Sequence, residues 1–188
     1  MSGLPQKRMT VDEYLAWAEG RPGRYELYNG VVYAMAPERA AHAEVKHAVA
    51  NALSSAIAKA RLPCWMLPDG MTVRVDKNTA HEPDALVYCG KKLADNAIEV
   101  PNPAIVVEVL SPSTRHIDAS AKLAGYFRLP SVHHYLIVDS EKRLVIHHCR
   151  GEGDLIATRL AGKGTLDLSP PGLKVPVARL FGRLAHNS

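Results

Sequence analysis

The chain has 188 residues, of which 47% are hydrophobic and 22% are charged. A length and balance of this kind are typical of one domain with a sizeable buried core, and they exclude a disordered, collagen-like or small disulfide-rich protein. The 23 Lys and Arg residues exceed the 19 Asp and Glu residues by only four, an excess too slight to identify a nucleic-acid partner by itself. We therefore expect a single domain over residues 1–188.

The cysteines and the N-terminal residues bear on the cellular compartment. Cys64, Cys89 and Cys149 are an odd number without a CxxC pair, so we interpret them as reduced thiols of a cytosolic protein. Residues Met1 to Arg8 lack the apolar stretch of a signal peptide, and no segment approaches the ~18 apolar residues of a membrane span. The sequence therefore predicts a cytoplasmic protein without a membrane partner.

A helix and a hairpin are predicted near the N-terminus. Thr10 and Glu13 form the Thr-x-x-Glu pattern of a capping box, which predicts a short helix that ends at about Gly20 or Pro22. The pair Asn29-Gly30 lies between apolar runs and suits a two-residue type I′ turn, so we expect a β-hairpin at this point.

A long helix is predicted from about Glu38 to Ala60. Its apolar face is formed by residues at helical spacing, which are His42, Val45, Val49, Leu53 and Ile57. Its other side is expected to carry Arg39, Glu44, Lys46 and Lys59.

Strands dominate the prediction for the rest of the chain, with one further helix. Turn residues and the polar segment Asp76–Glu82 separate three apolar runs, which are Cys64–Leu67, Met71–Val75 and Ala85–Tyr88. The run Ala104–Leu110 is the most apolar and is typical of a central strand buried on both faces. After it we expect a helix over Asp118–Phe127, strands over His133–Val138 and Leu144–His148, a weak strand near Leu155–Leu160 and a Pro-rich tail. This order predicts an α/β or α+β fold around one mixed sheet.

Glu108 is a carboxylate within the apolar central strand. An unpaired charge there costs several kcal/mol, so Glu108 requires a cation or hydrogen bonds unless it faces solvent at the strand end. Asp84 begins an earlier apolar run, and the separation of 24 residues suits a neighbouring antiparallel strand. Two carboxylates that meet across such strands suit Mg²⁺ or Mn²⁺. The alternative for Asp84 is a strand cap after Pro83.

Lys122 supplies a cation close to Glu108 in the sequence. Asp118, Lys122 and Tyr126 are spaced by four residues, so they share one face of the predicted helix. One interpretation is an exposed Asp118–Lys122 pair. The other is that the helix leans over the end of the Glu108 strand, where the amine could orient a water molecule or stabilise charge on a phosphate.

Glu26 and the histidines each allow more than one interpretation. Glu26 alternates with apolar residues of the hairpin, so it faces either water or a site. His42 is either a core residue or a contact to acidic groups. Neighbouring residues of a strand point to opposite faces, so we do not expect His133-His134 or His147-His148 to bind one metal as a pair. We assign these histidines to edges and surface.

Several stretches of the chain resemble the Uma family of restriction-endonuclease-like proteins, which belongs to the PD-(D/E)XK nuclease superfamily. These stretches are Tyr25–Gly30, Pro83-Asp84, Val107–Thr114 and the series Asp118, Lys122 and Tyr126. The resemblance covers about residues 9–181. It implies a restriction-endonuclease-like core, in which a central mixed β-sheet is flanked by helices and the metal site lies at one sheet edge.

The resemblance also implies a set of site residues. Asp84 and Glu108 match the acidic motif positions that hold Mg²⁺ or Mn²⁺, and Val109 matches the position whose backbone carbonyl joins the metal. Leu110 occupies the place of the motif lysine, so Lys122 is implied as a migrated replacement. Glu26 and His42 are expected to complete the pocket, Tyr126 to fix the rotamer of Lys122, and Asp118 to support it.

The sequence therefore predicts a metal-dependent endonuclease that acts on DNA, as a homodimer. Its phosphate contacts are expected from basic residues, which are Arg39, Lys46, Arg115 and Arg128. The alternative is a catalytically inactive nucleic-acid-binding or assembly module of the same fold. The loss of the strand lysine and the modest net charge favour this alternative.

Overall fold

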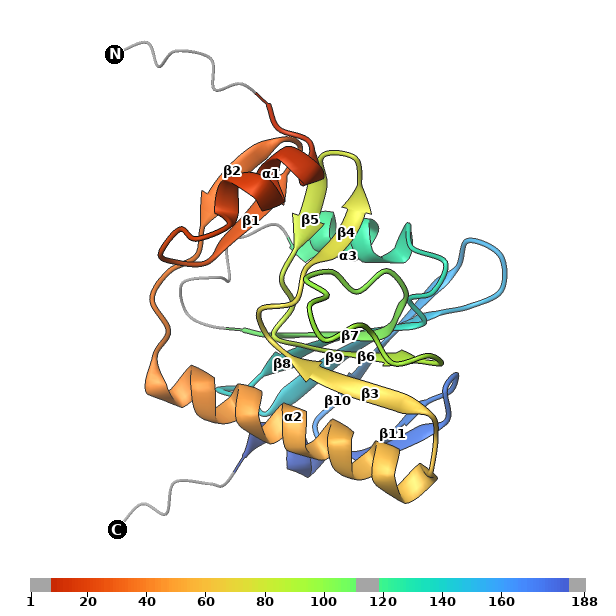
Figure 1. The fold of residues 1–188 in the computed structure, drawn as a ribbon. Coiled ribbons are helices and arrows are strands. Elements are labelled where there is room, and N and C mark those ends of the chain that lie inside the picture. The colour runs from red at the N-terminus through yellow and green to blue at the C-terminus, as the bar shows by residue number, and fades with distance from the viewer. Residues whose placement is uncertain (1–7, 111–118, 183–188) are drawn as a thin grey trace.

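The structure is a computed structural model that describes residues 8–110 and 119–182, and Figure 1 shows the arrangement of its elements. The helices are α1 (Val11–Ala18), α2 (Ala40–Ala60), α3 (Ala119–Phe127) and the 3-10 helix η1 (Val177–Phe181). The strands are β1 (Tyr25–Tyr28), β2 (Val31–Ala34), β3 (Cys64–Pro68), β4 (Val73–Asp76), β5 (Thr79–His81), β6 (Ala85–Cys89), β7 (Pro103–Val109), β8 (His134–Asp139), β9 (Leu144–Arg150), β10 (Ile156–Ala161), β11 (Thr165–Leu168) and β12 (Leu173–Pro176).

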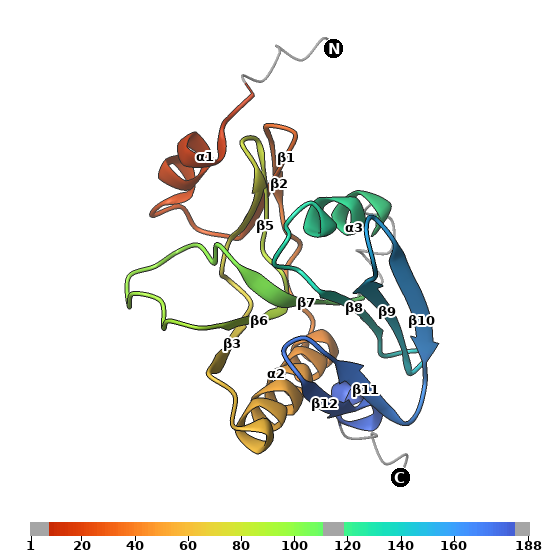
Figure 2. The same ribbon diagram turned by 90° about the vertical axis from the view of Figure 1, so that its right-hand side faces the viewer.

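A six-stranded mixed sheet in the order β10-β9-β8-β7-β6-β3 forms the centre of the molecule. Strands β7 and β8 are parallel, and the other neighbours are antiparallel. The two faces of the sheet are covered differently. Figure 2 shows α2, β11 and β12 on one face, and α3 with the N-terminal strands on the other. Strand β7 lies inside the sheet, which confirms the prediction of a central strand and of a mixed α/β fold.

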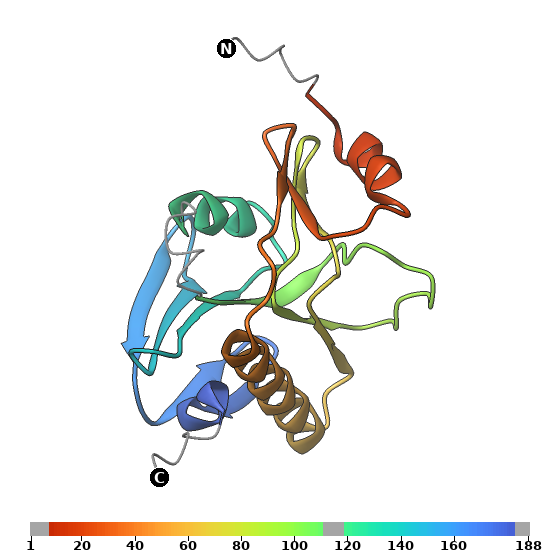
Figure 3. The same ribbon diagram turned by 90° about the vertical axis from the view of Figure 1, so that its left-hand side faces the viewer.

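The N-terminal hairpin β1–β2 and the later strands β4 and β5 form a second sheet in the order β2-β1-β5-β4, against which α1 packs (Figure 3). Thr10 and Glu13 make the expected capping box, with the Thr10 backbone N–H donating to Glu13 Oε2 over 2.8 Å. Asn29 and Gly30 both have positive φ, at 49° and 79°, as a type I′ turn requires. Both N-terminal predictions are therefore confirmed.

Two predicted loops of this chain contain strands. The polar segment Asp76–Glu82 includes β5, which pairs with β1 and β4 and is buried along its whole length. The Pro-rich tail includes the β11–β12 hairpin, whose buried residues alternate with exposed ones. In both cases short strands gain their burial from distant partners, which local composition does not reveal.

The expectation of three reduced thiols is wrong for two of the cysteines. Cys64 and Cys89 lie opposite each other on β3 and β6 and form a disulfide. Their facing positions in an antiparallel pair bring them together, although 25 residues separate them in sequence. Cys149 is a free thiol.

Within residues 8–110 and 119–182, no helix combines the length and the apolar composition that a membrane span requires.

Candidate active site

The ends of β6 and β7 bring Asp84 and Glu108 to neighbouring positions. Ala85 lies opposite Val107 in the antiparallel pair, so Asp84 and Glu108 come next to each other at the same end of the two strands. The backbone N–H of Val109 donates to Asp84 Oδ2 over 2.7 Å. The predicted antiparallel neighbourhood of these strands is therefore confirmed, and the Asp84 carboxylate is fixed by the backbone of the Glu108 strand.

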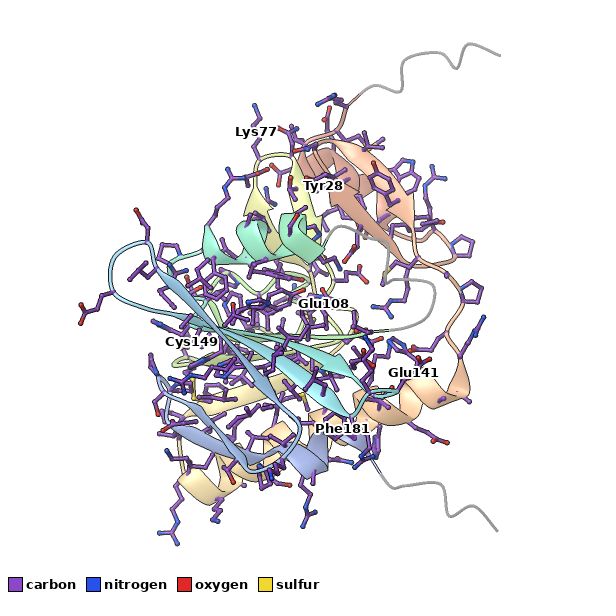
Figure 4. All side chains as sticks on the ribbon, turned by 180° about the vertical axis from the view of Figure 1, so that it is seen from behind. Tyr28, Lys77, Glu108, Glu141, Cys149 and Phe181 are labelled. Atoms are coloured by element: carbon purple, nitrogen blue, oxygen red, sulfur yellow. A yellow bond between two sulfur atoms is a disulfide. The ribbon has the colours of Figure 1, made fainter. Side chains whose placement is uncertain are left out.

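Helix α3 places a lysine and a tyrosine over Glu108. Lys122 Nζ donates to Glu108 Oε1 and to Glu26 Oε1, each over 2.9 Å. The Tyr126 hydroxyl donates to Glu108 Oε1 over 2.9 Å, so it holds this carboxylate rather than the lysine that it was predicted to hold. The side chains of Glu26, Glu108 and Lys122 are only 11–15% exposed. Figure 4 shows Glu108 between the sheet and α3.

Lys46 forms a second charged cluster with carboxylates from three segments. Its Nζ donates to Glu38 Oε2 and Asp69 Oδ2, each over 2.5 Å, and lies 3.6 Å from Asp84 Oδ1. Arg24 also donates to Asp69. Lys46 is 8% exposed, so it is buried and does not share the exposure of Arg39, Glu44 and Lys59, with which it was grouped on the other side of the helix. The sequence shows that a lysine follows Val45, but it does not show that Glu38 and Asp69 surround this lysine in the fold.

His42 connects these clusters through the backbone of β7. Its Nε2 lies 2.8 Å from the carbonyl oxygen of Val109, and its Nδ1 lies 2.6 Å from Glu38 Oε1. Both partners, the Val109 carbonyl and the Glu38 carboxylate, are hydrogen-bond acceptors. Asp84 Oδ2 is 4.0 Å from Nε2. His42 is thus held at the site by hydrogen bonds and is not an apolar core residue.

The site has more negative than positive groups. Within the described residues its carboxylates are those of Glu26, Glu38, Asp69, Glu82, Asp84 and Glu108, and its cationic side chains are those of Arg24, Lys46 and Lys122. Burial raises the pKa of Glu108 to about 7 and also raises the pKa of Asp84. Burial opposes ionisation of Glu26 as well, but Lys122 holds its pKa below the ordinary value. At Asp84 and Glu108 the effect of burial on the pKa therefore outweighs the opposing effect of the nearby Lys46 and Lys122 charges.

His81 is a residue of this region that the sequence did not indicate. Its side chain is 3% exposed, and neither ring nitrogen has a hydrogen-bond partner within the described residues. The ring packs against Tyr28 and Tyr126, and Nδ1 lies 3.9 Å from Glu26 Oε2. Burial lowers the pKa of His81 to about 4. Only the unexpected strand β5 brings it here, so no local pattern could have found it.

The remaining predicted residues lie apart from the carboxylates or outside the description. Arg39 is exposed at the start of α2, and Arg128 is exposed and pairs with Asp76 over 2.8 Å. Arg115 and Asp118 lie outside the described residues.

The assignment of the histidine pairs to edges and surface is wrong for three of the four residues. His134, His147 and His148 are buried on the interior strands β8 and β9, because hydrogen bonds from neighbouring groups satisfy their rings.

Comparison with known proteins identifies the family and the fold. The family model described as "Uma2: Putative restriction endonuclease" matches residues 11–178. Two uncharacterized proteins of Synechocystis sp. (strain ATCC 27184 / PCC 6803 / Kazusa) are each 25% identical to the chain. One, slr1290, aligns over 96% of this chain and 95% of its own length, and the other, sll1609, over 84% and 90%.

The fold is also that of a solved structure. The crystal structure of a putative nuclease belonging to DUF820 from Anabaena variabilis ATCC 29413 superposes with a TM-score of 0.69. It is 14% identical in sequence, and the match covers 92% of this chain and 97% of the other. The match of the Uma2 model over most of the chain confirms the resemblance noted from the motifs: the protein belongs to the Uma2 family, whose description is putative restriction endonuclease.

Proposed function

We propose that this protein is a metal-dependent endonuclease that hydrolyses phosphodiester bonds of DNA. The family description and the nuclease-like fold support the reaction class. The observation that carries the proposal is the contact of Lys122 Nζ with both Glu26 and Glu108, each over 2.9 Å, beside the Asp84 and Glu108 pair. These contacts place an amine next to two strand-end carboxylates even though Leu110 occupies the motif position of the lysine.

The donor set fits Mg²⁺ or Mn²⁺. The available groups are all oxygen ligands, which these cations prefer: the carboxylates of Asp84 and Glu108 and the carbonyl oxygen of Val109. Lys122 and Tyr126 both contact Oε1 of Glu108, which leaves Oε2 as the oxygen for a cation within the described contacts. The raised pKa values of both carboxyl groups also indicate a place where added positive charge is stabilising. When bound, the metal ion would supply Lewis-acid polarisation of the phosphate and a lower pKa for a water molecule.

The protein side chains would position the reacting groups. Lys122 donates two of its ammonium protons to Glu26 and Glu108 and would offer the third to a phosphate oxygen or to the attacking water molecule. The Tyr126 hydroxyl fixes the orientation of the Glu108 carboxylate. His42 fixes the Val109 carbonyl, and the Val109 N–H fixes Asp84. Each predicted metal ligand is thus held by a second group, as a preorganised site requires.

The experiment is a cleavage assay on supercoiled DNA with Mg²⁺ or Mn²⁺. We expect the wild-type protein to nick or linearise the DNA, and Asp84→Asn and Glu108→Gln to lose this activity while they keep a cooperative thermal transition. Asp95→Asn is the matched control, because its side chain is 94% exposed and forms its ion pair with Lys92, which is not a residue of the site. Retained cleavage by either site variant would contradict the proposal. Binding of DNA by a wild-type protein that cleaves no DNA with either metal would favour the inactive module instead.

We also propose that the protein acts as a homodimer through strand β10, which lies at one edge of the central sheet that the described residues form. This edge strand and the turn before it expose apolar side chains, with Leu155 71%, Ile156 39% and Leu160 67% exposed. An unpaired edge with apolar side chains is a template for pairing with a second strand. A two-fold pairing of this kind would present two candidate sites to one duplex.

A further inference from the structure

A second group of metal-binding side chains lies on the other face of the central sheet. His134 is opposite Cys149 on β8 and β9, and His147 is two residues before Cys149. Alternation therefore places all three on one face. Their donor atoms lie within 4.8 Å of one another.

This face is not the face of Glu108. In the parallel β7–β8 pair, Glu108 is opposite Ile137 and Ile105 is opposite His134. Ile137 packs with the α3 side, whereas Ile105 packs with the α2 and β12 side. Figure 4 labels Cys149 and Glu108 at separate places on the sheet. The cluster is therefore independent of the proposed nuclease site.

A hydrogen bond to the backbone holds one of the two imidazoles, His134, in an orientation that suits metal binding. His134 Nε2 donates to the backbone carbonyl oxygen of Pro170 over 2.9 Å, which leaves the Nδ1 lone pair directed at His147 Nε2, also 2.9 Å away. A ring held by a carbonyl through one nitrogen, with the other nitrogen free to coordinate, is the usual arrangement of a metal-binding histidine. Burial lowers the pKa of both rings. The recorded hydrogen bond of the Cys149 thiol is a long one, 3.6 Å to the carbonyl oxygen of Arg150.

We propose that His134, His147 and Cys149 bind a Zn²⁺ ion. Two nitrogens and a sulfur suit zinc and exclude Mg²⁺, which prefers oxygen. Tetrahedral zinc with Zn–N bonds of about 2.0–2.1 Å places two ligand nitrogens about 3.3 Å apart. The present 2.9 Å separation of the His134 and His147 nitrogens needs only a small widening. On binding, the Cys149 thiol releases its proton to solvent and the His147 proton moves from Nε2 to Nδ1.

The contacts around the cluster show which elements the ion would connect. Arg159 of β10 lies opposite His147 of β9 in the antiparallel pair. Through the Pro170 carbonyl, His134 connects the interior strand β8 to the turn between β11 and β12. A metal ion at this point would therefore join the C-terminal hairpin to the central sheet, and three protein ligands would leave one position for a water molecule.

The test uses Co²⁺ as a spectroscopic substitute for Zn²⁺ on the full chain, without thiol reductants. We expect a thiolate-to-cobalt charge-transfer band together with tetrahedral visible bands, at one equivalent of Co²⁺. Added Zn²⁺ should remove these bands, and a large excess of Mg²⁺ should not. Because Cys64 and Cys89 are joined in a disulfide, the sulfur band reports Cys149.

Two variants make the result decisive. Cys149→Ser should lose the sulfur band and bind Zn²⁺ at least about tenfold more weakly. His148→Ala is the matched control, because His148 is adjacent in sequence but belongs to the opposite face, where it stacks on Tyr135. The control should keep the band. Absence of the band in wild type at saturating Co²⁺, or an unchanged band in Cys149→Ser, would overturn the proposal. The cobalt spectra do not depend on DNA cleavage. A negative result for the zinc site would therefore leave the proposed nuclease function intact.

Discussion

The two faces of the central sheet carry polar groups of different chemistry. On the α3 side, Lys122 contacts the carboxylates of Glu26 on β1 and Glu108 on β7, and the groups that could bind a metal ion there are oxygens. On the α2 and β12 side, His134, His147 and Cys149 offer nitrogen and sulfur and are held by hydrogen bonds between neutral groups. One sheet can therefore hold a charged site whose stability depends on ion pairs and a neutral one that does not.

Among single substitutions that test this contrast, we expect the largest loss of stability from a change at Lys122. Lys122→Met would leave Glu26 and Glu108 buried beside each other without their shared cation, which costs about 3–5 kcal/mol of unfolding free energy. Urea unfolding at pH 7 measures the loss. Lys92→Met, a lysine with a 66% exposed side chain, is the control and should be nearly neutral. A Lys122→Met protein as stable as the control would show that the ion pairs do not hold the α3 side together.

The buried histidines on both faces should make the free energy of unfolding sensitive to acid. An unfolded histidine binds a proton below pH about 6.5, whereas the folded pKa of His81 and of His134 is about 4. The unfolded state therefore takes up protons at these histidines first, and their contribution to the free energy of unfolding falls between pH about 6.5 and 4, whereas the raised pKa of Glu108 contributes with the opposite sign. The contribution of the histidines is retained above that window. For His81 the full effect is about 3 kcal/mol.

The variant His81→Leu tests whether part of this acid sensitivity comes from His81 on the α3 side. It removes a ring whose nitrogens have no hydrogen-bond partner within the described residues, so we expect little loss of stability at pH 7 and a flatter pH dependence. Thermal unfolding at several pH values between 7 and 4 is the measurement. An unchanged slope in the variant would contradict the assignment.

The variant Tyr126→Phe tests the α3 side with a smaller expected loss of stability. It removes one buried hydrogen bond to the Glu108 carboxylate, with an expected loss of about 2 kcal/mol because the acceptor is charged. Cleavage should decrease but persist, since Lys122 still contacts the same oxygen. Full loss of stability, or no effect on either quantity, would mean that Tyr126 has another role.

A change at the sheet edge should leave both faces intact. Leu160→Lys places a charge on the 67% exposed edge strand β10, so monomer stability should change by less than about 0.5 kcal/mol. Light scattering should show a dimer for wild type and a shift towards monomer for the variant. A wild-type protein that is monomeric at every concentration would remove the dimer proposal.

The sequence predicted the parts of the site that neighbouring strands and helical spacing determine. The separation of Asp84 and Glu108 implied adjacent antiparallel strands, and the four-residue spacing of Lys122 and Tyr126 implied one helix face towards β7. In each case a local period and one short connection were sufficient.

The features that the sequence did not predict depend on contacts between distant segments. Lys46 is buried because Glu38 and Asp69 surround it, and His81 is buried because β5 pairs with β1. The Cys64–Cys89 disulfide likewise follows from the register of β3 and β6. Long-range pairing decides these environments, and residue type alone predicts exposure for Lys46 and reduced thiols for the cysteines.

The metal assignment can be tested most directly by crystals of the protein soaked in Mn²⁺ and measured at an anomalous wavelength. Our account predicts an anomalous peak between the carboxylates of Asp84 and Glu108, and no such peak in Glu108→Gln crystals treated in the same way. Wild-type crystals with no anomalous density between these two carboxylates at saturating Mn²⁺ would contradict the metal-dependent nuclease that we propose.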